Sequence, residues 1–320
     1  MPRIHIQNKA DDLESKITPE LWQALGGPEG ASFAEDEAGF RAGIADAAYL
    51  ITATSALRPY RALIPGQLRG IFCTSAGMDS IAPFDWLPQG TMLMNNSGVH
   101  ADRGGEYVAM ALLMLRQEMP AMIAAQQRGV WEKHYTSVLR GCTLVSIGTG
   151  ALGAAGARAA RLFGMKTIGV RTKAEPHPDF DRVVAAADLD SVLPLAEFLL
   201  LAAPLTPQSQ NILDARRIAL LPKGAGVINI GRGALIAQDA LCDALDAGAL
   251  GGAVLDVFSP EPIPPGHRLW TTRHLVITPH VSADDPAIYA SDSVKLFLEN
   301  LAAIERGETP PNLVDISKGY

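Results

Sequence analysis

Short apolar segments alternate with longer stretches of helical pattern through most of the chain. Each apolar run is rich in Val, Ile, Leu and Ala, and most of the intervening segments are long enough to hold a helix. This alternation predicts β-α-β units and parallel sheets, and therefore an α/β fold. The expected strands are Ala48–Ala53, Gly70–Cys73, Thr91–Met94, Thr143–Ile147, Met165–Val170, Phe198–Ala202, Gly226–Ile230, Gly252–Val257 and Leu275–Ile277.

One segment departs from this alternation. The range Asp102–Arg128 has a helical composition, and Pro120 should kink or break the helix because proline lacks an amide hydrogen. Its apolar surface needs a partner, so we expect this helix to connect two domains and to contact a second subunit. A further helix is expected over Ala287–Arg306. The apolar residues spaced to share one face of the first helix are Val108, Leu112, Leu115 and Met119.

Composition narrows the class of protein. A chain of 320 residues is long enough for two domains, and 48% hydrophobic with 19% charged residues excludes a disordered chain. The net charge is −7 and no run of Lys or Arg occurs, so neither nucleic acid nor an anionic membrane is expected as a partner. The longest apolar stretches, Tyr107–Leu115 and Phe198–Leu205, fall short of the roughly 20 residues that span a bilayer.

The cysteines and the N-terminal segment favour a cytoplasmic protein. Cys73, Cys142 and Cys242 are odd in number, lie far apart and form no Cys-x-x-Cys motif, so we expect reduced, buried thiols and no metal site. The segment Met1–Lys9 is followed by no apolar stretch typical of a signal peptide.

A glycine motif follows the expected strand Thr143–Ile147. The pattern is Gly-x-Gly-x-x-Gly, and an Ala-rich helical stretch, Ala154–Phe163, continues from it. Such glycines permit a tight turn, close approach of a pyrophosphate to the backbone, and packing of helix on strand. A glycine turn that serves only packing is the alternative. The residues expected to contact a dinucleotide are Gly148, Gly150, Ala151, Leu152 and Gly153.

The end of the next strand bears on the choice of cofactor. Sites for NAD place Asp or Glu about 20 residues after the motif, where it binds the ribose hydroxyls. This chain has Arg171, Thr172 and Lys173 there. Because a guanidinium can bind a 2′-phosphate through two hydrogen bonds, the sequence favours NADP(H), with NAD(H) left open.

Two later motifs carry candidate acid/base chemistry. The strand that ends at Ile230 is followed by Arg232 between two glycines, a setting suited to a small carboxylate or a carbonyl. Farther along, Glu261 stands between two prolines, and His280 follows a strand and a proline. A histidine and a carboxylate held in this way predict an acid/base pair.

The chain resembles the D-isomer-specific 2-hydroxyacid dehydrogenase family, closest to its glyoxylate/hydroxypyruvate reductase branch. The resemblance covers nearly the whole chain. Its blocks are Ile147–Gly153, Ala203–Pro207, Ile228–Gly233, Leu255–Glu261 and Thr278–His280.

This resemblance implies a fold and an assembly. A Rossmann nucleotide-binding domain over residues 100–281 would be inserted into a flavodoxin-like substrate domain formed by residues 1–99 and 282–320, with the active site in the cleft between them. Family members are usually homodimers joined through the nucleotide domain and its long helix, so a homodimer is expected.

The resemblance also assigns roles to residues. Arg232 would hold the carboxylate and carbonyl of the substrate, His280 would be the acid/base and Glu261 its partner. The backbone amides of Ala76 and Gly77 would bind the substrate carboxylate. The remaining cofactor contacts would be Pro204 and Thr206 near the adenosine, Ile230, and Asp256 beside the nicotinamide carboxamide, although Asp256 also fits a plain cap of its strand.

The implied reaction is hydride transfer between NADP(H) and a small 2-oxoacid or D-2-hydroxyacid. Two alternatives stay open: a dinucleotide-sensing binding protein of the same fold, and another 2-hydroxyacid dehydrogenase that uses NAD. A formate- or phosphite-type dehydrogenase fits less well, since the formate users of the family carry an amide residue where this chain has Glu261.

Overall fold

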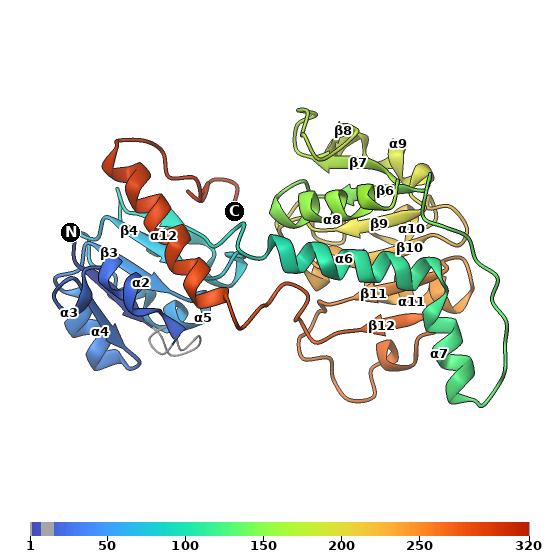
Figure 1. Ribbon diagram of the computed structural model, residues 1–320, viewed down its shortest axis with the longest axis horizontal. Coiled ribbons are helices and arrows are strands. Elements are labelled where there is room, and N and C mark those ends of the chain that lie inside the picture. Colours follow the sequence, from blue (N-terminus) through green and yellow to red (C-terminus); the bar gives the residue numbers. More distant parts are fainter. Residues whose placement is uncertain (1, 8–15, 320) are drawn as a thin grey trace. The chain divides into compact units, whose positions relative to one another are not determined.

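The computed structural model describes residues 2–7 and 16–319, which form two compact units (Figure 1). Unit 1 comprises Met1–Val99 and Asp285–Tyr320, and unit 2 comprises His100–Asp284. Met1, residues 8–15 and Tyr320 lie outside the described residues, so the N-terminal segment discussed above is described from Pro2 to Gln7.

Unit 2 ends three residues beyond the expected boundary at 281/282. The Ser282 amide donates to Asp256 Oδ2 at 2.9 Å. The His100 ring lies 3.0 Å from the Ala283 carbonyl oxygen. Hydrogen bonds therefore attach residues 282 and 283 to the unit that contains Asp256 and His100.

Unit 1 is built on a five-stranded parallel sheet with the order β2-β1-β3-β4-β5. This is the strand order of flavodoxin-like folds. The strands are β1 (Ile4–Gln7), β2 (Ala31–Ala34), β3 (Tyr49–Thr52), β4 (Gly70–Cys73) and β5 (Met92–Met94). The helices are α2 (Pro19–Ala24), α3 (Gly27–Gly30), α4 (Glu37–Ile44), α5 (Thr54–Leu57) and α12 (Tyr289–Glu305).

Successive residues of these strands point into two separate cores. Ile51 and Phe72 pack on the side of α12, where Phe297 meets Phe72 edge to face at 5.7 Å. Leu50 and Ile71 pack on the opposite side with residues of α4. The sheet is buried on both faces, which explains why β3 and β4 appear in the sequence as continuous apolar runs.

Unit 2 is built on a seven-stranded parallel sheet with the order β12-β11-β10-β9-β6-β7-β8. Counted from β6, this contains the Rossmann order 3-2-1-4-5-6 with one strand added. The strands are β6 (Thr143–Ile147), β7 (Lys166–Arg171), β8 (Arg182–Ala185), β9 (Phe198–Leu201), β10 (Gly226–Asn229), β11 (Gly252–Leu255) and β12 (Leu275–Ile277). The helices are α6 (Ala101–Arg116), α7 (Met119–Gln127), α8 (Ala151–Leu162), α9 (Leu189–Val192), α10 (Ala215–Ile218) and α11 (Gln238–Asp246).

Helices cover both faces of this sheet. Val108 and Leu112 of α6 share a buried cluster with Leu144, Leu200 and Val254 of the strands. In Figure 1, α6 runs alongside α8 on this face. On the other face, residues of α9, α10 and α11 enclose the alternate strand residues. The α/β class with parallel sheets that the sequence predicts is confirmed.

The long apolar segment forms two helices rather than one. Helix α6 ends at Arg116, Glu118 adopts a left-handed backbone with φ 50°, and Pro120 occupies the first turn of α7, where no amide hydrogen is needed. The predicted break is therefore confirmed. Among residues 2–7 and 16–319 no single helix is long and apolar enough to cross a membrane; α6 and α7 pass this test only together, and they bend by 66° at their junction.

Candidate active site

In unit 2, predicted site residues follow the carboxyl ends of parallel strands. Because these ends lie at one edge of a parallel sheet, residues distant in sequence share one side of the unit, where ligands bind in doubly wound folds. Gly148 follows β6, Arg171 ends β7, Pro204 follows β9, Arg232 follows β10, Asp256 follows β11 and His280 follows β12.

The glycine turn between β6 and α8 requires glycine at two positions. Gly148 has φ +102°, and a Cβ there would lie 2.6 Å from the Ala202 carbonyl oxygen. A Cβ on Gly153 would lie 2.1 Å from the Gly148 carbonyl oxygen. Gly150 differs, since a Cβ there would meet nothing within 4 Å.

The start of α8 can receive an anion. Gly150 is its N-cap residue, and no side chain caps the helix. The first amides of a helix carry partial positive charge and need acceptors, which a phosphate supplies. The space over Gly150 and these amides fit the pyrophosphate of a dinucleotide.

The basic segment after β7 lies beside this turn. The Gly148 amide donates to the Val170 carbonyl oxygen at 2.9 Å, which places Arg171 at the neighbouring strand end. The Arg171 side chain is 37% exposed, and its Nη2 lies 4.0 Å from Glu175 Oε2. Thr172 and Lys173 are exposed. A half-exposed cation is therefore available next to the phosphate turn.

A hydroxyl-rich turn follows β9. Ser209 Oγ donates to the Pro204 carbonyl oxygen at 2.7 Å and accepts from the Thr206 amide at 2.8 Å. The Ser209 amide donates to Thr206 Oγ1 at 3.2 Å. Thr206 is thus engaged in shaping its own turn, while Pro204 is exposed.

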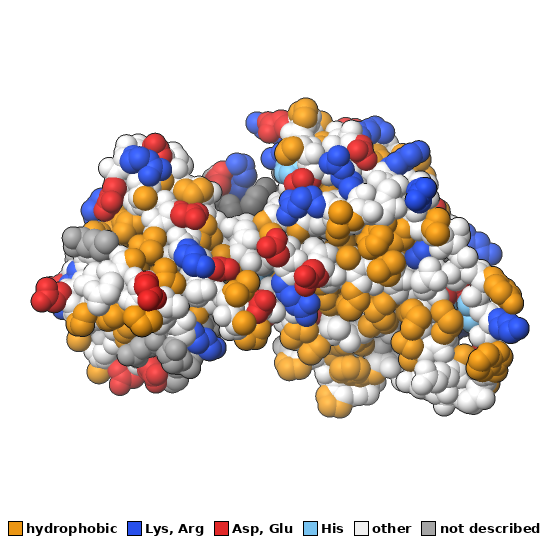
Figure 2. Space-filling view, viewed as in Figure 1, with side chains coloured by type: hydrophobic (Ala, Val, Ile, Leu, Met, Phe, Trp, Pro, Cys, Tyr) orange, Lys and Arg blue, Asp and Glu red, His pale blue; other side chains and the backbone are white. Residues whose placement is uncertain are grey.

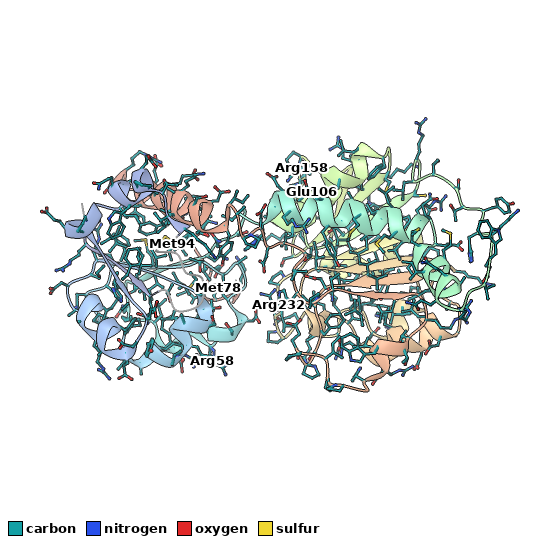
Figure 3. The ribbon with its side chains drawn as sticks, turned by 60° about the horizontal axis from the view of Figure 1, so that its bottom comes forward. Arg58, Met78, Met94, Glu106, Arg158 and Arg232 are labelled. Carbon is teal, nitrogen blue, oxygen red and sulfur yellow. The ribbon has the colours of Figure 1, made fainter. Side chains whose placement is uncertain are left out.

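Arg232 lies in a closely packed turn at one end of the unit 2 sheet (Figure 3). Asn229 braces the turn, since its Nδ2 donates to the Arg232 carbonyl oxygen at 2.9 Å and its Oδ1 accepts from the Gly231 amide at 3.0 Å. Arg232 Nη1 donates to the Gly231 carbonyl oxygen at 2.8 Å. A Cβ on Gly233 would lie 2.0 Å from Phe258, so only glycine fits there.

Ile230 contributes to the same turn through its backbone. Its amide donates to the Leu201 carbonyl oxygen at 3.1 Å, and its side chain is buried in the core on the α6 side. A contact of Ile230 with a cofactor would therefore involve its main chain.

His280 and Glu261 are brought together. His280 Nδ1 lies 2.9 Å from Glu261 Oε2. The other carboxylate oxygen, Oε1, accepts a hydrogen bond from the Phe258 amide at 2.6 Å. The His280 side chain is 52% exposed, so its ring can reach a ligand while Glu261 holds one nitrogen.

Asp256 is fully buried and faces the loop that carries His280. Its carboxylate accepts hydrogen bonds from Thr278, Val281 and Ser282. Its expected contact with a nicotinamide stays a prediction. The hydrogen bonds that Asp256 makes are those expected of the alternative, in which it caps the end of its strand.

Ala76 and Gly77 belong to unit 1, after β4 at the carboxyl edge of the five-stranded sheet. Asn95 Nδ2 donates to the Ala76 carbonyl oxygen at 3.1 Å. Both residues are partly exposed. Their expected role in binding a substrate carboxylate stays a prediction.

Two polar residues that shape unit 2 are absent from the predicted site. Asn229 braces the Arg232 turn, and Tyr107 on α6 lies 2.6 Å from Thr278 Oγ1. A single polar residue in the apolar run of β10 was a visible sign for Asn229. Tyr107 is indistinguishable in sequence from a core aromatic residue.

Comparison with known proteins agrees with this architecture. The family model described as D-isomer specific 2-hydroxyacid dehydrogenase, NAD binding domain, matches residues 109–282. A glyoxylate/hydroxypyruvate reductase A from Serratia proteamaculans is 32% identical over 269 residues, which cover 80% of this chain and 82% of that protein.

Two solved structures resemble the whole chain. An NADPH-dependent glyoxylate/hydroxypyruvate reductase from Sinorhizobium meliloti, in complex with NADP and sulfate, has a TM-score of 0.82 at 26% identity and covers 100% of both chains. A D-isomer specific 2-hydroxyacid dehydrogenase from Xanthobacter autotrophicus, in complex with NADPH and MES, has a TM-score of 0.85 at 25% identity and covers 100% of this chain and 99% of that one. The chain therefore belongs to the D-isomer specific 2-hydroxyacid dehydrogenase family and is an oxidoreductase that acts on the CH–OH group of small 2-hydroxyacids with a nicotinamide dinucleotide.

Proposed function

We propose that this dehydrogenase reduces a small 2-oxoacid of the glyoxylate or hydroxypyruvate type with NADPH. The observation that carries the proposal is the His280–Glu261 pair, 2.9 Å apart, on the same sheet edge as Arg232 and the glycine turn. An acid/base, a cation and a dinucleotide turn are the groups that reduction of a keto acid requires.

His280 is the proton donor in this proposal. Glu261 accepts a hydrogen bond from Nδ1, which leaves Nε2 to face the substrate. When bound, the nicotinamide supplies the hydride to the carbonyl carbon. His280 then donates its Nε2 proton to the carbonyl oxygen as negative charge develops there.

Arg232 binds and polarises the substrate. Its guanidinium can pair with a carboxylate through two hydrogen bonds, which orients the adjacent carbonyl. Its positive charge also stabilises the oxygen as it becomes an alkoxide. The turn that holds Arg232 is braced by Asn229 and by the contact of Gly233 with Phe258, so the charge is held before the substrate arrives.

The preference for NADPH rests on Arg171, Thr172 and Lys173. A 2′-phosphate would find a half-exposed guanidinium and an exposed ammonium beside the glycine turn. The Sinorhizobium and Xanthobacter proteins were solved with NADP and NADPH, which supports the same choice here. Pro204, Thr206, Ile230 and Asp256 would contribute the remaining contacts.

The protein is proposed to work as a homodimer in the cytoplasm. Exposed apolar side chains on α6, on α7 and in the segment after α7 offer a surface for a second copy. Cys73, Cys142 and Cys242 are buried and unpaired, as expected in a reducing compartment.

A panel of 2-oxoacids, assayed with NADPH and with NADH, tests the reaction. We expect turnover of glyoxylate or hydroxypyruvate with NADPH, and His280→Ala should lower kcat by roughly 100- to 10,000-fold, the usual contribution of one acid/base group. No turnover of any small 2-oxoacid would instead favour a sensor of dinucleotides.

The His280–Glu261 pair has its own test. Glu261→Gln keeps the length of the side chain but removes the carboxylate that holds Nδ1 of His280. Reduction by Glu261→Gln should be slower than by the parent, with NADPH affinity unchanged, because a charged acceptor no longer holds the ring. A kcat of Glu261→Gln equal to that of the parent would show that the pairing has no part in catalysis.

A further inference from the structure

A buried carboxylate organises the loop that presents His280. Asp256 Oδ1 accepts hydrogen bonds from Thr278 Oγ1 at 2.6 Å and from the Val281 amide at 2.9 Å. Asp256 Oδ2 accepts from the Ser282 amide at 2.9 Å. The three donors lie on both sides of His280 in the chain, so Asp256 ties the two ends of a short loop whose centre is the proposed acid/base.

Tyr107 extends this network to α6. Its hydroxyl lies 2.6 Å from Thr278 Oγ1, and the side chain is buried. Burial raises the pKa of Tyr107 to about 12, so the phenol keeps its proton in neutral solution. The single proton of the Thr278 hydroxyl goes to Asp256, because an ionised carboxylate only accepts hydrogen bonds. Tyr107 therefore donates to Thr278, and Thr278 donates to Asp256.

The backbone of His280 needs this support. His280 has φ +56°, in the left-handed region that side-chain-bearing residues seldom occupy. Its amide lies 2.9 Å from the Asp256 carbonyl oxygen and 3.1 Å from the Thr278 carbonyl oxygen. The direction of the imidazole follows from this backbone conformation, which Asp256 and Thr278 hold.

We propose that Tyr107 and Thr278 are positioning residues for His280, acting through Asp256. The inference rests on the proposed function, since it concerns the same acid/base. The chain of hydrogen bonds from α6 would fix the ring so that Nδ1 meets Glu261 while Nε2 points to the substrate oxygen. An ionised carboxylate has about four acceptor sites, and three are already taken by this loop. One acceptor site remains for the nicotinamide contact proposed above for Asp256.

The test compares variants that remove one hydrogen bond each. Thr278→Val removes the hydroxyl with little change of shape, Thr278→Ser restores it, and Tyr107→Phe removes only the phenol oxygen. Steady-state reduction of a small oxoacid substrate gives kcat and KM for each variant. The dissociation constant of NADPH, the melting temperature and the isotope effect with NADPH deuterated at C4 are measured beside them.

Loss of alignment should slow the chemical step in a folded enzyme. We expect Thr278→Val to lower kcat by roughly 10- to 100-fold, the cost of a misplacement near 1 Å, with NADPH affinity unchanged and a larger isotope effect. Tyr107→Phe should show the same pattern more weakly, and Thr278→Ser should recover most of the activity. If Thr278→Val fails to fold, Tyr107→Phe and Thr278→Ser still decide the matter.

Thr272→Val is the matched control. Thr272 is another threonine of unit 2; it is buried, and its hydroxyl donates to the Arg268 carbonyl oxygen at 3.0 Å, outside the His280 loop. Its loss should lower the melting temperature and leave kcat and the isotope effect unchanged. If Thr278→Val and Tyr107→Phe also lower only the melting temperature, Tyr107 and Thr278 are structural residues and the inference is wrong.

Two further outcomes distinguish a failure of this inference from a failure of the proposed function. If His280→Ala is inactive while Thr278→Val and Tyr107→Phe retain full kcat, only the inference fails. If His280→Ala is as active as the parent, the proposed function fails and the inference fails with it. An effect of Thr278→Val confined to NADPH affinity would also overturn the positioning role.

Discussion

At the scale of single residues, Gly150 and Gly153 lie in one turn but meet different surroundings. A methyl group on Gly153 would overlap the Gly148 carbonyl oxygen at 2.1 Å, whereas one on Gly150 would meet open space. Gly153→Ala should therefore destabilise the fold by about 1–3 kcal/mol, the usual cost of overpacking. Gly150→Ala should keep the melting temperature of the parent but weaken NADPH binding, because the methyl group occupies the approach to the phosphate.

Thermal denaturation with and without NADPH distinguishes these two effects. The parent should gain stability with ligand, Gly150→Ala should gain much less, and Gly153→Ala should begin from a lower melting temperature. NADPH binding to Gly150→Ala with the affinity of the parent would mean that no phosphate approaches this glycine.

Arg171 should govern the choice between the two dinucleotides. Replacing its guanidinium by the carboxylate of Asp removes a charge-assisted hydrogen bond to a 2′-phosphate and adds repulsion. We expect Arg171→Asp to lower kcat/KM with NADPH by at least roughly 10- to 100-fold, the equivalent of one such bond, and to leave NADH far less affected. The measurement is the ratio of efficiencies with the two cofactors.

Arg306→Asp is the control for charge alone. Arg306 is an exposed residue at the end of α12 in unit 1, where it pairs with Glu308 at 2.7 Å. Arg306→Asp changes the net charge of the chain by the same amount as Arg171→Asp. It should leave the ratio of efficiencies with NADPH and NADH unchanged. A parent enzyme that prefers NADH would contradict the assignment of Arg171.

Residue-scale prediction from the sequence identified the strand ends, the glycine turns and the His280–Glu261 pair, but not the partners of Asp256. The motifs containing Gly148, Arg232 and His280 carry their own local signals, and the parallel strands bring them to one edge. The partners of Asp256 lie in the segment from Thr278 to Ser282 and become visible only when β11 and β12 pair in register. No local pattern encodes that alignment, so Asp256 could be placed near the site but its partners could not be identified.

At the scale of elements, the strands that the sequence predicts are those with continuous apolar runs. All nine expected strands are present, and the strands that were not predicted are β1, β2 and β8. Strands β2 and β8 lie at sheet edges, where one side lacks a neighbouring strand and less burial is required. Strand β1 lies between β2 and β3, but His5 and Gln7 interrupt its apolar run although both are buried.

His5 makes the stability of unit 1 sensitive to acid. Burial lowers the pKa of His5 below its usual value of 6.5, since the charged ring is disfavoured in the sheet. At a pH between the lowered pKa of the folded chain and 6.5, the unfolded chain binds a proton that the folded chain does not. Stability should therefore be fully present above about pH 6.5 and should fall as pH drops below it, by up to about 1.4 kcal/mol per pH unit from this group.

Urea unfolding of the parent and of His5→Asn at pH 7.5 and 5.5 checks this expectation. The other histidines are common to both proteins, so the difference between their pH dependences isolates His5. The parent should lose more of its unfolding free energy between the two pH values than the variant does. Equal losses would mean that His5 is protonated as readily in the folded chain as in the unfolded one.

At the scale of the whole molecule, exposed apolar side chains gather on one face of unit 2. Figure 2 shows hydrophobic side chains gathered on the face of unit 2 that carries α6. Met110 and Leu113 are 41% and 43% exposed on α6, and Trp131 and Tyr135 in the following segment are 91% and 88% exposed. Gathered exposed apolar side chains mark association sites.

Burial of this surface by a second copy gives the last prediction. The parent should elute with the mass of two chains in size-exclusion chromatography with light scattering, over a wide range of concentrations. Met110 and Leu113 are one helical turn apart, so Met110→Glu combined with Leu113→Glu places two charges in the proposed interface and should shift the protein to the mass of one chain.

Leu162→Glu is the control, because Leu162 is 83% exposed at the end of α8 and its replacement should leave the mass unchanged. A parent with the mass of one chain at every concentration would exclude the dimer. A doubly substituted protein that remains dimeric would move the interface away from this face of α6.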